Sequence, residues 1–186
     1  MKIFKRVLLI VLVMTAFSAN AQFKLGVGGG LNMSNFGGSD VSNTDSRLGF
    51  NGGFMVEIKL PVKLGFEADI LFSTKGASVN FDPTFPAADY KLSYIDVPVV
   101  VKIYMAKVLS FQLGGQYSML ISGKFAGTDV KDQLKSSDLS AVVGFGLDVL
   151  KVHTSVRYNY GLTSIDDTGS DVKSNMITLT LGVWIK

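Results

Sequence analysis

The chain has 186 residues, no cysteine and a formal net charge of +3. The lack of cysteine excludes disulfides and the commonest structural zinc and thiol chemistry, and the length suits one domain. The mean hydropathy is positive, yet beyond the first residues no apolar run approaches the 18 or so residues of a membrane-spanning helix. High apolar content without such a run is typical of distributed β-strands.

Residues 1–21 have the pattern of a secretory signal. Three basic side chains precede an apolar run at 7–17, and the small-residue pattern A-x-A follows at 19–21. This order predicts a cleavable signal peptide. The apolar run is well short of the roughly 20 residues that a retained helical anchor needs. We therefore predict cleavage after Ala21 and a mature outer-membrane β-barrel domain at residues 22–186.

The positive charge belongs to the predicted signal. Lys2, Lys5 and Arg6 lie within it, and the remaining chain has 15 basic and 15 acidic residues. Nucleic-acid binding requires a concentrated basic surface. The neutral mature chain therefore gives no support for a nucleic-acid partner.

Eight segments alternate apolar residues with small or polar ones at a period of two. In the clearest of them, residues 92–105, Val97 and Val99 fall on one face while Asp96 and Lys102 fall on the other. This alternation predicts strands with one apolar and one polar face. The predicted strands are residues 23–31, 48–59, 64–73, 92–105, 111–122, 139–148, 152–161 and 177–185.

The connections between these strands alternate strictly in length. Short turns are expected near Pro61, Ala106 and Leu150, and the four long connections are at residues 32–47, 76–91, 123–138 and 163–174. This places both termini and all short turns at one end, as in outer-membrane barrels. A soluble sandwich would instead bury the apolar row. We predict an all-β fold: an eight-stranded antiparallel transmembrane up-and-down β-barrel with long outer loops and short periplasmic turns.

Charged residues gather on the predicted inward face. Because eight strands leave room for side chains but little else, these charges are expected to pair in a polar plug. A proton or ion path is the alternative interpretation. The predicted lumen network consists of Glu57, Glu67, Asp69, Asp96, Lys102 and Arg157.

The order and spacing of several segments resemble the PorT-like outer-membrane β-barrel proteins of Gram-negative bacteria. The similar segments are LGVGGGLNMS, GFNGGFMVEIKL, GFEADILFSTKG, YIDVPVVVKIY, FQLGGQYSMLISG and NMITLTLGVWIK. The resemblance implies an outer-membrane barrel, and some members are tied to protein secretion. Two features depart from it. Pro98 lies inside a strand and requires a bulge or local break, and the chain ends on Lys186 instead of an aromatic residue.

Candidates for catalysis or ligand binding are few. His153 is the only histidine and is read as a packing residue near a short turn. The glycines at 26–30 are read as lumen space, because no helix follows to form a phosphate site. Asp166, Asp167 and Asp171 would suit calcium, but solvated loop charge is the alternative. We predict no catalytic residue, cofactor or metal, and no enzyme activity.

Three functions are compatible with this pattern. The first is a structural or interaction component of the outer membrane, with the membrane lipid, the barrel-assembly machinery during insertion and other envelope proteins as partners. The second is an accessory of a secretion or transport system, as the PorT-like resemblance implies. The third is a secreted carrier of lipocalin type, which the charges on the inward face oppose.

Overall fold

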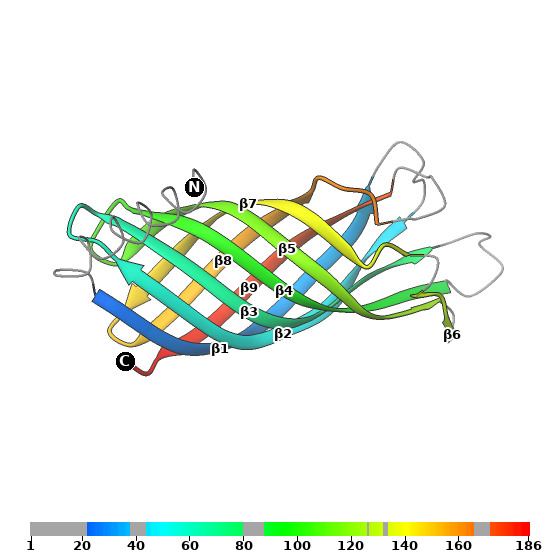
Figure 1. The fold of residues 1–186 in the computed structure, drawn as a ribbon, viewed down its shortest axis with the longest axis horizontal. Helices are drawn as coiled ribbons and strands as arrows, with labels where there is room; N and C mark the ends of the chain where they lie inside the picture. Colours follow the sequence, from blue (N-terminus) through cyan, green and yellow to red (C-terminus); the bar gives the residue numbers. More distant parts are fainter. Residues whose placement is uncertain (1–21, 38–43, 80–87, 126, 132–133, 166–171) are drawn as a thin grey trace, which may run out of the picture.

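The computed structural model describes residues 22–37, 44–79, 88–125, 127–131, 134–165 and 172–186 (Figure 1). Nine strands lie within these residues. They are β1 (Gln22–Gly37), β2 (Thr44–Lys59), β3 (Leu64–Val79), β4 (Ala88–Tyr104), β5 (Leu109–Phe125), β6 (Thr128–Asp129), β7 (Ser137–Val149), β8 (Val152–Gly161) and β9 (Lys173–Trp184). Among the same residues, no helix is long and apolar enough to cross a membrane.

Eight of these strands close into a single antiparallel barrel. Each pairs with its neighbours in the order β1, β2, β3, β4, β5, β7, β8, β9, and β9 returns to β1. The closing register aligns Gly26 with Trp184 and Gly37 with Lys173. The two-residue β6 pairs only with the end of β5. The predicted eight-stranded up-and-down barrel is confirmed.

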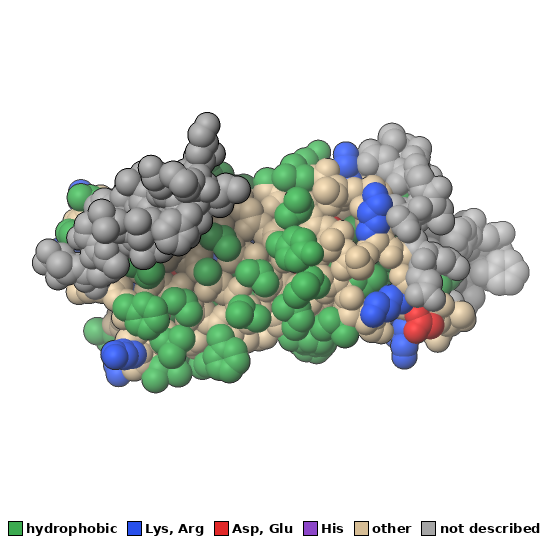
Figure 2. Space-filling model, in the orientation of Figure 1, with side chains coloured by type: hydrophobic (Ala, Val, Ile, Leu, Met, Phe, Trp, Pro, Cys, Tyr) green, Lys and Arg blue, Asp and Glu red, His purple; other side chains and the backbone are tan. Residues whose placement is uncertain are grey.

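The outer wall of the barrel is apolar around its middle. Figure 2 shows a belt of hydrophobic side chains between two ends that carry lysine and arginine. Val99 on β4 is 53% exposed, whereas its neighbour Val100 is 1% exposed. Exposed and buried residues alternate along most of β5, β7, β8 and β9, as the pleat requires. The belt therefore faces lipid, and the opposite face fills the lumen.

The short turns and the C-terminus share one end of the barrel. The turns lie between β2 and β3, between β4 and β5, and between β7 and β8 (Figure 1). Lys63 and Leu150 adopt positive φ angles of 59° and 56° in two of them. The backbone of Leu25 bonds to Lys186 and Ile185 at the same end. We call it the short-turn end, and the opposite one the long-loop end.

The strands continue further toward the long-loop end than the sequence pattern predicted. β1 extends to Gly37 instead of residue 31, and β3 to Val79 instead of residue 73. The predicted connections at 32–47 and 76–91 are consequently much shorter. Neighbouring strands stabilise these extensions by ladder hydrogen bonds even where the side chains are small and polar, so the predicted boundaries are wrong here. The predicted signal at 1–21 lies outside the described residues.

Pro98 interrupts the ladder between β3 and β4 without shifting it. Ala68 pairs with Val99 and Leu71 with Asp96, which is one continuous register on both sides of the proline. Proline has no N–H to donate, so a local break is the expected consequence. The nearest bulge in β4–β5 pairing lies between Ser93 and Tyr94. Of the two outcomes considered, the structure therefore has the break.

Candidate functional site

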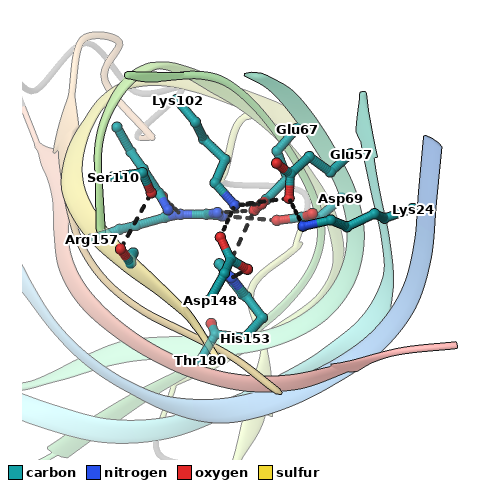
Figure 3. A network of polar contacts seen from close by, with 12 residues as sticks. Lys24, Glu57, Glu67, Asp69, Lys102, Ser110, Asp148, His153, Arg157 and Thr180 are labelled. Atoms are coloured by element: carbon teal, nitrogen blue, oxygen red, sulfur yellow. Dashed lines mark hydrogen bonds and ion pairs between the residues drawn. The ribbon is translucent and has the colours of Figure 1, made fainter. Parts of the chain in front are cut away.

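The lumen near the short-turn end is filled by one polar network to which all eight barrel strands contribute. Side chains from opposite sides of the barrel wall point toward one another inside the lumen (Figure 3). The contributing side chains, in strand order, are Lys24, Glu57, Glu67, Lys102, Gln112, Asp148, Arg157 and Trp184. We call this set, with Asp69, Tyr104 and His153, the inner network.

Lys102 is the centre of the inner network. Its ammonium lies 3.1 Å from Glu57 Oε2, 2.8 Å from Glu67 Oε2 and 3.1 Å from Asp148 Oδ2. The side chain is fully buried. A lysine has three N–H donors, and each has an acidic acceptor here. One cation therefore links strands β2, β3, β4 and β7 across the barrel.

Arg157 makes a second set of cross-barrel contacts. Its Nη1 donates to Asp69 Oδ2 at 2.8 Å, its Nη2 donates to Glu67, and its Nε donates to Gln112 Oε1 at 2.6 Å. The planar guanidinium presents its N–H donors in a fixed geometry, which suits several acceptors held around it. Because Glu67 also accepts from Lys102, the two cations belong to one connected network.

Asp148 and His153 face each other across the short turn between β7 and β8. His153 Nδ1 lies 2.9 Å from Asp148 Oδ1, and Trp184 Nε1 donates to the same oxygen at 3.0 Å. Tyr104 donates its hydroxyl to Glu57 and lies 3.2 Å from Asp148 Oδ2. These contacts close the inner network toward the short-turn end.

The half of the lumen nearer the long-loop end, which we call the outer half, has polar side chains deep inside and apolar ones at its opening. Lys75 pairs with Asp96 at 2.8 Å and donates to Ser118 at 2.9 Å. Its ammonium lies 4.4 Å from the centre of the Tyr94 ring. Beyond this pair comes an apolar group that we call the outer cluster. It consists of Phe36, Leu92, Tyr94, Leu120 and Ile165, with Leu134 and Val172 packed against it.

Residues from two long connections complete the outer cluster. Ile165 donates its N–H to Val172 at 2.8 Å and accepts from the N–H of Lys135 at 2.8 Å. The connection that follows β6 is thereby tied to the connection between β8 and β9. Ile165 is buried although it lies outside the strands. The described residues thus place buried side chains inside both halves of the lumen.

The structure brings together five of the six side chains predicted for the lumen network. Glu57, Glu67, Asp69, Lys102 and Arg157 lie in the inner network. Asp96 is also buried in the lumen, but it pairs with Lys75. Six residues of strand separate Asp96 from Lys102, which corresponds to roughly 20 Å.

Sequence reasoning missed Asp148, His153 and Lys75 as members of these networks. A signal existed for the first two, because both were on predicted inward rows and a two-residue turn pairs positions 148 and 153. For Lys75 no such signal was available, because the predicted strand ended before it.

The inner network has the chemistry of a structural cross-link. The His153 ring is fully buried, and its Nε2 lies 3.9 Å from Glu67 Oε1. A ring without exposed surface cannot meet a substrate from solution, although its contact with Asp148 is one that orients histidines in catalytic sites. In the part of the chain that the structure describes, no set of three acidic, histidine or cysteine residues is arranged to hold a metal. Asp166, Asp167 and Asp171 lie outside that part.

A closed barrel with an apolar belt and a polar interior defines the class of outer-membrane β-barrel proteins. A family model described as outer membrane protein beta-barrel domain matches residues 17–167. The chain belongs to this family, and the protein is an outer-membrane β-barrel protein. No curated protein matches the chain.

Solved structures that are similar to this fold include two bacterial surface proteins. The attachment invasion locus protein Ail of Yersinia pestis is 17% identical, with a TM-score of 0.55, and the match covers 88% of this chain and 99% of that one. Neisserial surface protein A is 18% identical, with a TM-score of 0.56, and the match covers 88% of this chain and 98% of that one. At these identities the likeness establishes the fold.

Proposed function

We propose that this protein is a non-enzymatic, non-conducting interaction component of the outer membrane. The observation that carries the proposal is the set of paired and packed side chains inside the lumen. Lys102 and Arg157 bind carboxylates from opposite walls of the barrel, and the outer cluster lies above them. With the interior occupied by paired side chains, the surfaces left for function are the two ends of the barrel.

The proposed partners contact the long-loop end. The strands β2 to β5 have 16 or 17 residues, whereas a tilted strand crosses the bilayer with about 9 to 11. The excess raises the long loops above the lipid surface, where other envelope proteins and lipid head groups are accessible. Export by a signal at residues 1–21 and insertion by the barrel-assembly machinery are part of this proposal.

Site-specific photocrosslinking in intact cells tests the interaction role. A photoreactive residue at Lys135, exposed at the long-loop end, is expected to capture a discrete partner. The matched control replaces Leu113, which is 54% exposed on the lipid-facing belt. The same products from both positions, or none from position 135, would contradict the proposal.

The PorT-like resemblance supports a second candidate, an accessory role in secretion. Gene deletion separates the two candidates, because an accessory is needed for cargo export while a purely structural component is not. Loss of exported cargo with unchanged outer-membrane composition would favour the accessory role. The lipocalin-type carrier is disfavoured because the exposed belt is apolar and the lumen is charged, the reverse of what a soluble carrier of apolar ligands needs.

A further inference from the structure

The short-turn end contains a hollow lined by three lysines. Its volume is about 770 Å³, within the size range of small-molecule sites. Its lining comes mainly from the turn between β2 and β3 and the turn between β4 and β5. The lining residues are Gln22, Lys59, Leu60, Pro61, Lys63, Tyr104, Ala106 and Lys107.

The lining has one sign of charge. It includes Lys59, Lys63 and Lys107, and no acidic side chain is among the described lining residues. The two carboxylates that contact the Tyr104 hydroxyl, Glu57 and Asp148, are buried, and both already accept from Lys102. The three ammonium groups therefore concentrate positive potential in a hollow open to the short-turn side, which favours an anion.

The Tyr104 ring, which forms the floor of the hollow, holds one of these lysines in place. Lys59 Nζ lies 3.8 Å from the centre of the Tyr104 ring, a cation–π contact. The ring cannot turn away, because the Tyr104 hydroxyl is bonded within the inner network. The inner network thus positions a cation at the bottom of the hollow as well as filling the lumen.

The turn that presents Lys63 is also fixed. Lys63 has φ 59°, a conformation that side chains other than glycine, asparagine and aspartate seldom adopt. Leu60 donates its N–H to Leu64 at 2.7 Å, and Tyr104 donates its N–H to the Lys63 carbonyl at 2.8 Å. A glycine would fit this backbone with less strain, yet the position carries a lysine that lines the hollow.

We propose that this hollow binds a small phosphate-bearing ligand from the periplasmic side. Lysine is a common point-charge ligand for phosphate, and three of them match the multiple charge of a phosphate group. Leu60, Pro61 and Ala106 provide apolar contacts for the body that carries the phosphate. A soluble phosphate ester and a lipid head group of the inner leaflet share this chemistry. The inference does not depend on the interaction role proposed for the long-loop end.

Calorimetric titration of the purified protein with pyrophosphate, in a non-ionic detergent at low salt, tests the site. We expect saturable one-to-one binding. In the double variant Lys63→Gln, Lys107→Gln the affinity is expected to fall about tenfold or more, because two of the three charges are lost. The matched control is Lys151→Gln, an exposed lysine on the third short turn that does not line the hollow; its affinity should stay within about twofold.

Lys63→Gly separates binding from folding. It removes one charge and relieves the left-handed backbone, so the affinity should fall about threefold while the thermal unfolding temperature does not fall. Absence of saturable binding in the wild type, or an equal loss in Lys151→Gln, would overturn the proposal, since diffuse surface charge would then explain the attraction.

A second titration identifies the source of the phosphate. The protein is placed in nanodiscs of phosphatidylcholine alone or with phosphatidylglycerol. Weaker pyrophosphate binding in the presence of phosphatidylglycerol assigns the hollow to a lipid head group. Unchanged binding assigns it to a soluble phosphate ester.

Discussion

The two halves of the lumen are stabilised by different physical means. Near the short-turn end, the inner network links all eight barrel strands through charged hydrogen bonds centred on Lys102 and Arg157. Near the long-loop end, the buried ion pair of Lys75 with Asp96 lies beneath an apolar cluster that includes residues outside the strands. The inner network links the barrel strands to one another through the lumen. The outer cluster instead packs the long connections against the end of the barrel.

The largest expected loss in the free energy of unfolding comes from a substitution in the inner network. Lys102→Met removes a cation bonded to three carboxylates and should lower the free energy of unfolding by about 3 to 5 kcal/mol, because uncompensated buried charges remain. Guanidinium-induced unfolding in lipid vesicles measures it. Lys75→Met removes a cation with a single carboxylate, Asp96, at ion-pair distance, and a smaller loss is expected. An equal loss in both variants would remove the proposed difference between the halves.

The outer cluster responds to loss of apolar volume. Leu92→Ala opens a cavity among buried side chains and should cost roughly 2 to 3 kcal/mol, at the low end for such changes because the connections can close around it. Limited proteolysis should show faster cleavage at the long-loop end while the transmembrane wall stays intact. Loss of the whole barrel at the same rate would show that the outer cluster stabilises more than the connections.

The smallest expected losses in the free energy of unfolding come from removing single hydrogen bonds, one in each half of the lumen. Trp184→Phe removes a donor to the Asp148 carboxylate and should cost about 1.5 to 2 kcal/mol, as is usual for bonds to charged groups. Ser73→Ala removes a neutral acceptor of Asn32 in the outer half, for which about 0.5 to 1 kcal/mol is expected. Unfolding followed by circular dichroism measures both, and a larger cost for Ser73→Ala would reverse the comparison.

The sequence predicted the barrel and its two faces because the pleat has a period of two. Val99 and Lys102 were assigned to opposite faces from alternation alone, and their exposures agree with that assignment. The turn between β7 and β8 was equally predictable, because only two residues separate the strands. Alternation and turn length are local properties, so they are visible without a structure.

The partners of each lumen charge were not predictable in the same way. Arg157 reaches Asp69 across 88 positions in the chain, and this contact depends on how the strands stagger when β9 closes on β1. The separation of Asp96 from the inner network has the same origin. The hollow at the short-turn end also requires closure, because its lysines lie on β2 and on two different turns. Strand stagger sets the position of each inward side chain along the barrel axis, and the alternation of residues does not encode this stagger.

Conductance of the purified protein in planar lipid bilayers tests the central claim most directly. The paired charges of the inner network and the outer cluster above it occupy successive levels of the lumen. The protein should therefore show no steady ohmic current of porin size. A stable conductance whose ion selectivity changes when Lys102 or Arg157 is neutralised would contradict the account and make the lumen a pathway.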